Sequence, residues 1–208
     1  MADNYLENKY AEYQAKKNAR ATTSRSNKVS GKTRRVFVTG GANGIGNAIV
    51  KAFRSAGHRV AFCDIDEKAG KETALHTGTR FFNLDVSDSN ALEGALATLV
   101  KEWDDIDIII NNVGISEFSP ITKTTVEDFD RILSVNLRPA FITSRFLAIH
   151  RESLMKKNGY GRIINISSTR YLMSEADSEG YAASKGGLYS LTHALAISLA
   201  KWNITVNS

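Results

Sequence analysis

From residue 35 onward, short apolar runs alternate with longer segments of helical periodicity. The apolar runs predict strands at 35–40, 59–64, 80–85, 107–112, 162–167 and 203–208. The segments between them predict helices near 45–56, 67–76, 88–103, 125–156 and 180–201. Strands this continuously apolar are buried on both faces, and strand–helix–strand units cross over right-handed. The pattern therefore predicts a doubly wound α/β fold, with a parallel sheet between two layers of helices.

Residues 34–208 are expected to form one domain, preceded by a basic arm at 1–33. Proline occurs only at Pro120 and Pro139, so nothing within 35–208 is typical of an interdomain linker. Residues 1–35 hold nine Lys and Arg against three acids, a net charge of +6, whereas the remaining chain has −1. We expect the polar stretch 21–33 to be a flexible linker. Before it, four residues predict either a short docking helix or a solvated tail: Tyr5, Leu6, Tyr10 and Tyr13.

Composition and charge argue against several functional classes. No apolar run approaches the ~20 residues of a membrane span, and residues 1–20 lack the apolar core of a signal peptide. We therefore expect a cytoplasmic protein without a membrane partner. Because the positive charge lies in the arm, we expect no nucleic-acid partner. A single cysteine, Cys63, and four widely spaced histidines argue against a disulfide and against a metal site.

A glycine-rich turn, TGGANGIGNAIV, joins the first predicted strand to the first helix. Gly40, Gly44 and Gly46 fit a dinucleotide site in which each glycine has a different task. One of the three would allow the sharp turn, another would let a phosphate approach the backbone N–H groups, and another would let the helix pack closely. Glycines alone are a weak signal, but strand, turn, helix and second strand are all in place. No Lys-Ser/Thr pair follows, which excludes a nucleoside-triphosphate loop. We expect Asn43 and Ile45, in the same turn, to contact the cofactor as well.

The second predicted strand ends at Asp64, eighteen residues after Gly46. A carboxylate at this point can accept hydrogen bonds from the adenosine ribose hydroxyls and repels the 2′-phosphate of NADP. Neither Asn43 nor Asn47 supplies a compensating positive charge in the turn. The sequence therefore favours NAD(H). The alternative, a solvated carboxylate in the charged turn DIDEK, stays open.

Tyr181 and Lys185 stand four positions apart in the run GYAASKGG. On a helix they share one face, and the small residues between them leave room beside that face. This spacing indicates that another molecule or helix lies close against the pair.

Taken together, these motifs resemble the short-chain dehydrogenase/reductase family. The matching residues are Thr39–Gly46 for its TGxxxGxG turn, 111–114 (NNVG) for its NNAG, Asn136 in SVNL, Ser168 in INISS, and Tyr181 with Lys185 for YxxxK. Ser168 precedes Tyr181 by thirteen residues, a spacing usual in that family. The resemblance covers roughly 34–208 and implies a single Rossmann-like, NAD-binding domain. Val113, in place of the usual alanine, is a departure that adds bulk.

The resemblance implies a catalytic set of Asn136, Ser168, Tyr181 and Lys185. Tyr181 would remove or return a proton while hydride passes to or from the nicotinamide, Ser168 would hydrogen-bond the substrate oxygen, and Asn136 would hold a water in a proton relay. A free tyrosine, with a pKa of about 10, is a poor base near pH 7, and a cation one helical turn away favours its phenolate. Lys185 would supply that charge and hold the nicotinamide ribose. Three of these residues could instead have a purely structural role. Tyr181 could merely pack, Ser168 could cap a helix or turn, and Asn136 could hydrogen-bond the backbone across the sheet.

Further cofactor contacts and an oligomer interface also follow from the resemblance. Asp85 would end the third strand and hold the adenine amino group, with Val86 lining the same pocket. Asn112 and Gly114 would form the floor beneath the adenosine half. Helices 125–156 and 180–201 would form a four-helix interface in a homodimer or homotetramer. Leucines 188, 191, 195 and 199 recur at helical spacing and suit either that interface or the core.

The resemblance also implies a further substrate loop and a last strand beyond position 208, and we expect both to be missing from this chain. The loops 115–120 and 168–180 remain near the expected substrate, and their polarity, with Arg170, Glu175 and Asp177, favours a small polar alcohol or ketone. The leading hypothesis is an NAD(H)-dependent enzyme that interconverts a secondary alcohol and a ketone. The alternative is a non-catalytic NAD(H)-binding sensor or scaffold protein.

Overall fold

The computed structural model of the chain describes residues 31–155 and 159–208. Nearly all of the basic arm expected at 1–33, with its docking-helix and solvated-tail alternatives, lies outside the described residues. The residues from Thr33 to Ser208 form one compact unit.

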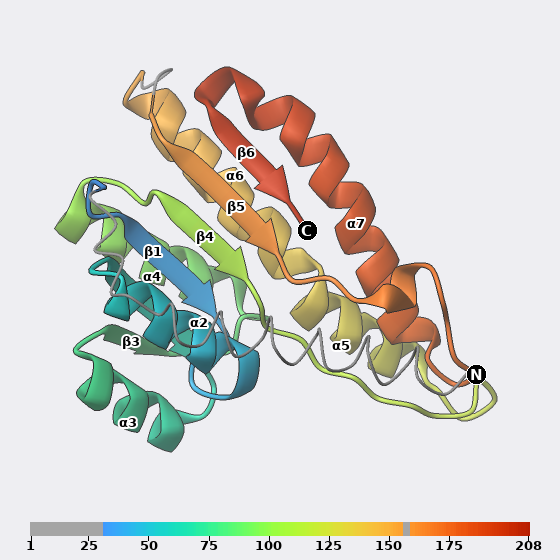
Figure 1. The fold of residues 1–208 in the computed structure, drawn as a ribbon. Coiled ribbons are helices and arrows are strands. Elements are labelled where there is room, and N and C mark those ends of the chain that lie inside the picture. The colour runs from blue at the N-terminus through green and yellow to red at the C-terminus, as the bar shows by residue number, and fades with distance from the viewer. Residues whose placement is uncertain (1–30, 156–158) are drawn as a thin grey trace, which may run out of the picture. The chain divides into compact units, whose positions relative to one another are not determined.

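One parallel sheet of six strands organises this unit (Figure 1). The strands are β1 (Arg35–Thr39), β2 (Arg59–Asp64), β3 (Arg80–Asn83), β4 (Ile108–Asn111), β5 (Gly161–Asn165) and β6 (Ile204–Asn207). Their order is β3-β2-β1-β4-β5-β6, so the direction of winding reverses between β1 and β4. Thr39 at the end of β1 is level with Cys63 of β2 and Asn111 of β4. The carboxyl ends of the central strands therefore open at one edge, where ligands bind in doubly wound folds.

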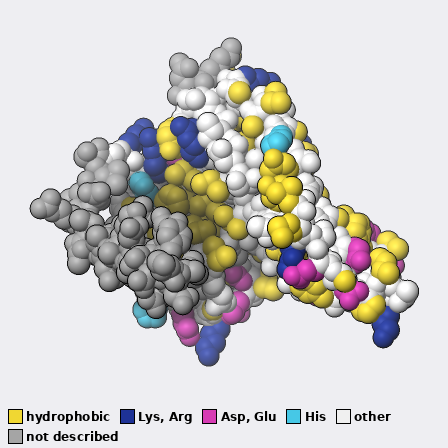
Figure 2. Space-filling view, turned by 45° about the vertical axis from the view of Figure 1, so that its right-hand side comes forward, with side chains coloured by type: hydrophobic (Ala, Val, Ile, Leu, Met, Phe, Trp, Pro, Cys, Tyr) yellow, Lys and Arg dark blue, Asp and Glu magenta, His cyan; other side chains and the backbone are white. Residues whose placement is uncertain are grey.

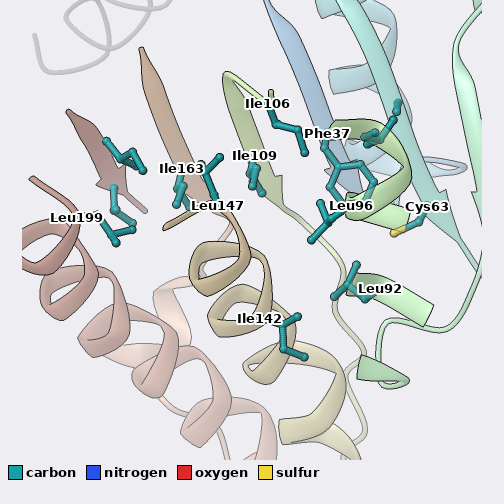
Figure 3. Packing of buried hydrophobic residues seen from close by; sticks show 14 of the residues in the cluster. Phe37, Cys63, Leu92, Leu96, Ile106, Ile109, Ile142, Leu147, Ile163 and Leu199 are labelled. Carbon is teal, nitrogen blue, oxygen red and sulfur yellow. The ribbon is translucent and has the colours of Figure 1, made fainter. Parts of the chain in front are cut away.

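Helices cover both faces of the sheet. They are α2 (Gly44–Ser55), α3 (Glu67–Thr77), α4 (Ser89–Trp103), α5 (Val126–Asn136), α6 (Arg138–Ser153) and α7 (Glu179–Leu199), with 3₁₀ turns η1 (Thr169–Tyr171) and η2 (Ala200–Trp202). Alternate residues of β1 belong to different core clusters: Phe37 shares one with Leu96 of α4 and Leu147 of α6 (Figure 3), whereas Val36 shares the other with Val50 of α2. The prediction of a doubly wound α/β fold is confirmed.

The prediction of one continuous helix at 125–156 is wrong. The segment divides at Leu137, which ends α5 and caps α6. Pro139, in the first turn of α6, has no N–H to donate to the carbonyl of Val135, and its ring would clash with that carbonyl in a continuous helix. Taken together, Val126–Ser153 has the length and composition of a membrane span, and 44% of its most apolar window is buried.

Two strands differ from the expectation of burial on both faces. The residues of β3 are half-buried or exposed, and those of β6 alternate between buried and exposed. Both lie at the edges of the described sheet, where one side lacks a neighbouring strand. The third strand also ends at Asn83, so Asp85 follows the strand by two residues and does not close it.

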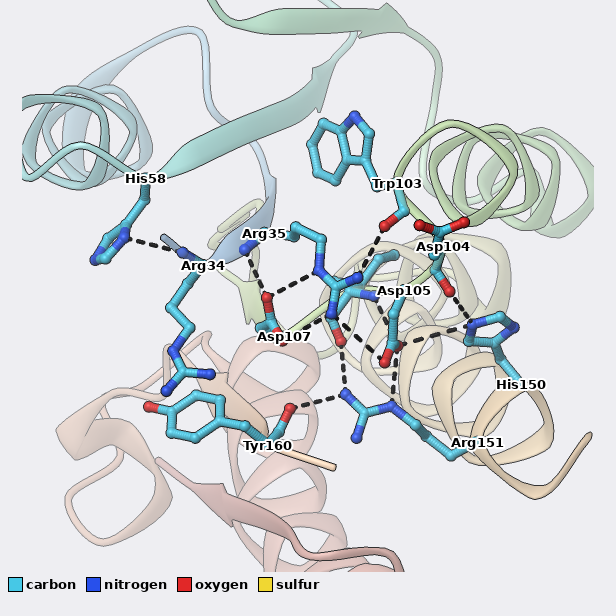
Figure 4. A network of polar contacts seen from close by, with 11 residues as sticks. Arg34, Arg35, His58, Trp103, Asp104, Asp105, Asp107, His150, Arg151 and Tyr160 are labelled. Carbon is cyan, nitrogen blue, oxygen red and sulfur yellow. Dashed lines mark hydrogen bonds and ion pairs between the residues drawn. The ribbon is translucent and has the colours of Figure 1, made fainter. Parts of the chain in front are cut away.

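A charged network joins the amino end of the sheet to α6 (Figure 4). Asp107 accepts from the backbone N (2.8 Å), Nε (2.9 Å) and Nη2 (3.0 Å) of Arg35. Arg151, fully buried, donates from Nε to Asp105 (2.9 Å) and from Nη2 to the carbonyl of Tyr160 (2.8 Å). Burial raises the pKa of Asp107, but the hydrogen bonds and charge of Arg35 outweigh it, so the pKa lies below its ordinary value.

Replacing Asp107 should show how much this network stabilises the fold. Asp107→Asn should lower the free energy of unfolding at pH 7 by about 2 kcal/mol, because the guanidinium of Arg35 loses its hydrogen bonds to a charged acceptor and keeps only the ion pair with Asp105. The native pKa of Asp107 is depressed, so its contribution is present above the unfolded pKa of about 3.9 and is lost as pH falls through the native value. Urea unfolding should therefore show a smaller difference in unfolding free energy between wild type and variant at pH 3 than at pH 7.

The exposed pair of Glu93 and Arg145 provides the control, because such pairs contribute little. Glu93→Gln should change the unfolding free energy by less than about 0.5 kcal/mol. Equal losses in the two variants, or a gap for Asp107→Asn that widens in acid, would contradict this account.

Candidate active site

The glycine-rich turn between β1 and α2 requires glycine for separate reasons. Gly40 (φ +69°) and Gly44 (φ +53°) have left-handed backbone conformations that favour glycine. The N–H of Gly40 donates to the carbonyl of Cys63 (2.8 Å), which ties the turn to β2. At Gly46, a Cβ would lie 1.8 Å from the carbonyl oxygen of Gly40, so only glycine allows α2 to start this close to the strand. The sharp turn and the close helix packing expected from the sequence both have a counterpart here, and the approach of a phosphate stays a prediction.

The start of α2 leaves backbone N–H groups without a side-chain acceptor. Asn43 is the N-cap but makes no side-chain cap, and the first turn carries no acid. Its Nδ2 instead donates to Asp66 at the start of α3 (3.0 Å). Ile45, in the first turn, is 66% exposed. An uncapped helix N-terminus of this kind suits an anionic group such as a pyrophosphate.

Asp64 is held in place by the backbone. Its Oδ2 accepts from the N–H of Ala42 (2.9 Å) and its Oδ1 from the N–H of Asp66 (3.1 Å). Each oxygen retains a lone pair, so the carboxylate can still accept from a pair of hydroxyls. The carboxylate of Asp64 is therefore oriented by the turn and is not simply a solvated surface charge.

Asp64 lies on the wall of a cavity of about 230 Å³ at the carboxyl edge of the sheet. The cavity is lined by Gly40, Asp64, Ile65, Leu84, Asp85, Val86, Ser87, Val113, Ile115, Arg131 and Val135. Three residues expected around the adenosine half of a cofactor thus line one cavity, Asp64, Asp85 and Val86, together with Gly40 of the glycine-rich turn. The sequence reasoning missed Ile65, Arg131 and Val135, because only the folded chain brings α5 opposite the end of β2.

Asn112 braces the turn from the neighbouring strand. Its Nδ2 donates to the carbonyls of Thr39 (3.1 Å) and Gly40 (3.0 Å). The hydroxyl of Thr39 accepts from the N–H groups of Asn112 (3.0 Å) and Val113 (3.2 Å). Asn112 therefore supports the expected floor of the site by holding β1 and β4 together. Thr39 also holds these two strands together, and its position directly before the first glycine of the turn is the sequence feature that could have indicated this role.

Lys185, Tyr181, Asn136 and Gly114 come together at the end of β4. Lys185 is 4% exposed, and its Nζ donates to the carbonyl of Ile166 (2.9 Å). The same Nζ lies 5.6 Å from the centre of the Tyr181 ring. A Cβ on Gly114 would lie 3.5 Å from both Lys185 Nζ and Asn136 Oδ1. Burial lowers the pKa of Lys185, because the ammonium has lost much of its water.

Asn136, the last residue of α5, makes the backbone contact that the structural alternative anticipated. Its Oδ1 accepts from the N–H of Ile115 and its Nδ2 donates to the carbonyl of Ile115, both at 2.8 Å. Nδ2 also donates to the hydroxyl of Ser184 on α7 (3.1 Å). Asn136 therefore ties the chain after β4 to α5 and α7.

Ser168 follows β5 and is half-buried at the start of η1. It caps that turn, accepting from the N–H of Arg170 at Oγ (3.3 Å). Because Oγ acts here as an acceptor, its proton remains available for another group. η1 packs against α7, where Tyr171 stacks on Tyr189 with ring centroids 4.3 Å apart. This contact holds the segment of Ser168 beside the helix that carries Tyr181.

The close contact at Gly46 yields a test of the turn. Gly46→Ala should lower the melting temperature and, if the turn holds the dinucleotide that the sequence predicts, weaken NADH binding at least tenfold, because the new methyl cannot lie 1.8 Å from an oxygen and α2 must move. NADH fluorescence titration and thermal unfolding measure the two effects. The control is Gly94→Ala on α4, where a Cβ meets nothing within 4 Å. That variant should bind NADH normally and be slightly more stable; identical behaviour of the two variants would contradict the close contact.

Comparison with known proteins identifies relatives of the whole described unit. The model of the short chain dehydrogenase family matches residues 34–208. An uncharacterized oxidoreductase of Thermotoga maritima is 40% identical over 176 residues, covering 82% of this chain and 67% of that protein. The cyclopentanol dehydrogenase of a Comamonas species is 34% identical (83% and 70% covered), and the sorbitol dehydrogenase of Cereibacter sphaeroides is 33% identical (87% and 70%). The chain spans 63–70% of the length of these curated relatives and of an oxidoreductase of Bacillus subtilis.

Solved structures share the architecture. An apo enzyme from Clostridium thermocellum is 39% identical with a TM-score of 0.74, covering 84% of this chain and 70% of that one. A 4-hydroxyisoleucine dehydrogenase, solved in complex with NADH, is 32% identical with a TM-score of 0.74, covering 84% and 73%.

Proposed function

Because the chain belongs to the short-chain dehydrogenase family, we propose that it is an NAD(H)-dependent oxidoreductase that interconverts a secondary alcohol and a ketone, with Tyr181 as general acid and base. The observation that carries this proposal is the buried ammonium of Lys185, 5.6 Å from the Tyr181 ring, beside Asn136 and Gly114. The oxidoreductase relatives and the cavity beside Asp64 support it.

The cofactor proposal concerns both ends of a nicotinamide dinucleotide. The bound nicotinamide would supply the hydride acceptor or donor. Gly40, Gly44 and the uncapped start of α2, with Asn43 and Ile45, would hold the pyrophosphate. Asp64, fixed by two backbone N–H groups, would accept from the adenosine ribose, which favours NAD over NADP.

The proton chemistry would rest on Tyr181 and Lys185. An ammonium held close to a phenol favours the phenolate, and burial strengthens this effect because less water screens the charge. The hydrogen bond from Lys185 to Ile166 fixes the ammonium at the end of β5. Ser168, with its hydroxyl proton available, would donate to the substrate oxygen. We propose a positioning role for Asn136, because both Nδ2 hydrogens are used, on Ile115 and Ser184; a relay water would have to donate to the remaining lone pair of Oδ1.

We propose a small polar alcohol or ketone as substrate. Four charged residues lie in 168–180, and two of them, Arg170 and Glu175, pair with each other, so their charges compensate. The polarity argument therefore depends mainly on Asp177 and Glu179 and on relatives such as the sorbitol dehydrogenase of Cereibacter sphaeroides. The cyclopentanol dehydrogenase relative shows that an apolar ring is accommodated elsewhere in this group.

We further propose a cytoplasmic homodimer or homotetramer formed through α5, α6 and α7. Phe141 and Ile149 on α6 are each 49% exposed, and Ile197 on α7 is 81% exposed. Hydrophobic side chains gather along α7 in the space-filling view (Figure 2). Leu188 and Leu199 belong to the core instead, with 2% and 6% exposure.

The acid–base role of Tyr181 is tested by removing one oxygen. Tyr181→Phe should lower kcat for alcohol oxidation by about 10²–10⁴-fold while leaving NADH affinity within a few-fold, because only the proton carrier is lost. Tyr189→Phe, on the same helix and stacked on Tyr171, is the matched control and should keep its activity. Undiminished turnover in Tyr181→Phe would refute the assignment, and NADH binding without turnover in wild type across a panel of alcohols and ketones would favour a non-catalytic role.

Cofactor preference is tested at Asp64. Asp64→Ala should reduce the ratio of kcat/KM for NADH over NADPH by about ten- to a hundredfold, because two hydrogen bonds to a charged acceptor are lost and the repulsion of the 2′-phosphate disappears. Glu72→Gln removes an exposed carboxylate of α3 outside the cavity and should leave the ratio unchanged. A wild type that already prefers NADPH would refute the proposed cofactor.

A further inference from the structure

Arg131 is the only cation among the described residues that line the cavity beside Asp64. Two carboxylates, Asp64 and Asp85, face the same space, and most of the remaining wall is apolar, including Val86 and Val135. Arg131 lies one helical turn before Val135 on α5, opposite the loop that follows β2. A single guanidinium in an otherwise apolar and acidic cavity indicates a role in binding a ligand there.

Glu117 pairs with this guanidinium. It lies in the loop between β4 and α5 and forms an ion pair with Nη2 of Arg131. Both side chains are 47% exposed, so the pair contributes little to stability. The carboxylate engages Nη2 at one edge of the planar group, and Arg131 lines the cavity. The pair also connects the cavity to the loop that Asn136 anchors at Ile115.

Guanidinium faces suit aromatic rings. The group is planar and weakly hydrated, and it stacks on π systems more readily than an ammonium does. The walls contributed by Val86 and Val135 offer apolar surface to the ring of a nucleobase, while Asp85 can accept from an exocyclic amino group. An adenine ring in this cavity would therefore have a guanidinium within reach of its face.

We propose that Arg131 determines affinity for the adenine end of the cofactor by stacking on the base, and that Glu117 is the residue that positions it. This inference rests on the proposed function, since it takes the cavity to be the adenosine site. It adds a contact that no sequence motif indicated, from a helix that is far from the glycine-rich turn along the chain. It also separates adenine recognition by Arg131 from ribose recognition by Asp64.

The experiment compares dissociation constants of NADH, 5′-AMP and nicotinamide mononucleotide for the full chain and its variants. Arg131→Met should weaken NADH and 5′-AMP by the same factor, about three- to twentyfold, and leave nicotinamide mononucleotide unchanged. Arg131→Lys should recover less than half of that loss, because an ammonium lacks the planar face. Glu117→Gln should weaken both adenine ligands by a smaller factor, about two- to fivefold.

Arg145→Met is the matched control, because Arg145 forms an exposed ion pair with Glu93 and does not line the cavity. It should bind all three ligands as wild type does. Wild-type affinity of Arg131→Met for NADH and 5′-AMP would overturn the inference, as would tighter NADPH binding by Glu117→Gln with unchanged 5′-AMP affinity, which would assign Arg131 to a ribose phosphate. Failure of the wild type to bind any nicotinamide dinucleotide would instead overturn the proposed function.

Discussion

The hydrogen bond from Lys185 to the carbonyl of Ile166 is the contact on which the arrangement of the site depends. It fixes a buried ammonium at the carboxyl end of β5 and, with the bond from Asn165 to Thr192, ties α7 to that strand. Tyr181, one turn earlier on the same helix, is placed by the same contact. An ammonium that has lost most of its water interacts strongly with any charge that forms nearby. The proposed acid–base chemistry follows from this combination of burial and proximity.

The remaining parts of the site are held by short contacts between neighbouring strands. Asn112 binds the carbonyls of Thr39 and Gly40, so the glycine-rich turn cannot move independently of β4. Asn136 fixes Ile115 from both sides and reaches Ser184, which links the chain after β4 to α7. The proposed cofactor end and the proposed catalytic end are therefore joined through one strand.

Much of this could be predicted because the signals are local. The strand positions and the role of Gly46 follow from short patterns, since a strand, a tight turn and a helix leave their mark on adjacent residues. The division of the helix at Leu137 was also signalled locally, by Pro139, but the long periodic pattern around it outweighed that signal. The exposure of β3 and β6 depends on which strands lie beside them, which no pattern within the strand reveals.

Contacts between distant residues could not be predicted from the sequence. Asp107 and Arg35 are 72 positions apart, and the fold alone makes them neighbours. Arg131 reads as an ordinary surface arginine of an amphipathic helix until the structure places it on the wall opposite Ile65. For the same reason the sequence offers a backbone bond of Asn136 only as one alternative and does not reveal its partners, Ile115 and Ser184. Residue types indicated the chemistry, whereas the partners required the folded chain.

The central claim is that the charge of Lys185 tunes the proton transfer at Tyr181, and the pH dependence of alcohol oxidation tests it most directly. With NAD⁺ saturating, kcat of the wild type should rise with pH. In Lys185→Met the midpoint of this rise should lie about one to two pH units higher, because the cation that favours the phenolate is gone. Lys185→Arg should keep most of the wild-type profile, since an arginine retains the charge. A midpoint that stays at the same pH in Lys185→Met would contradict the account.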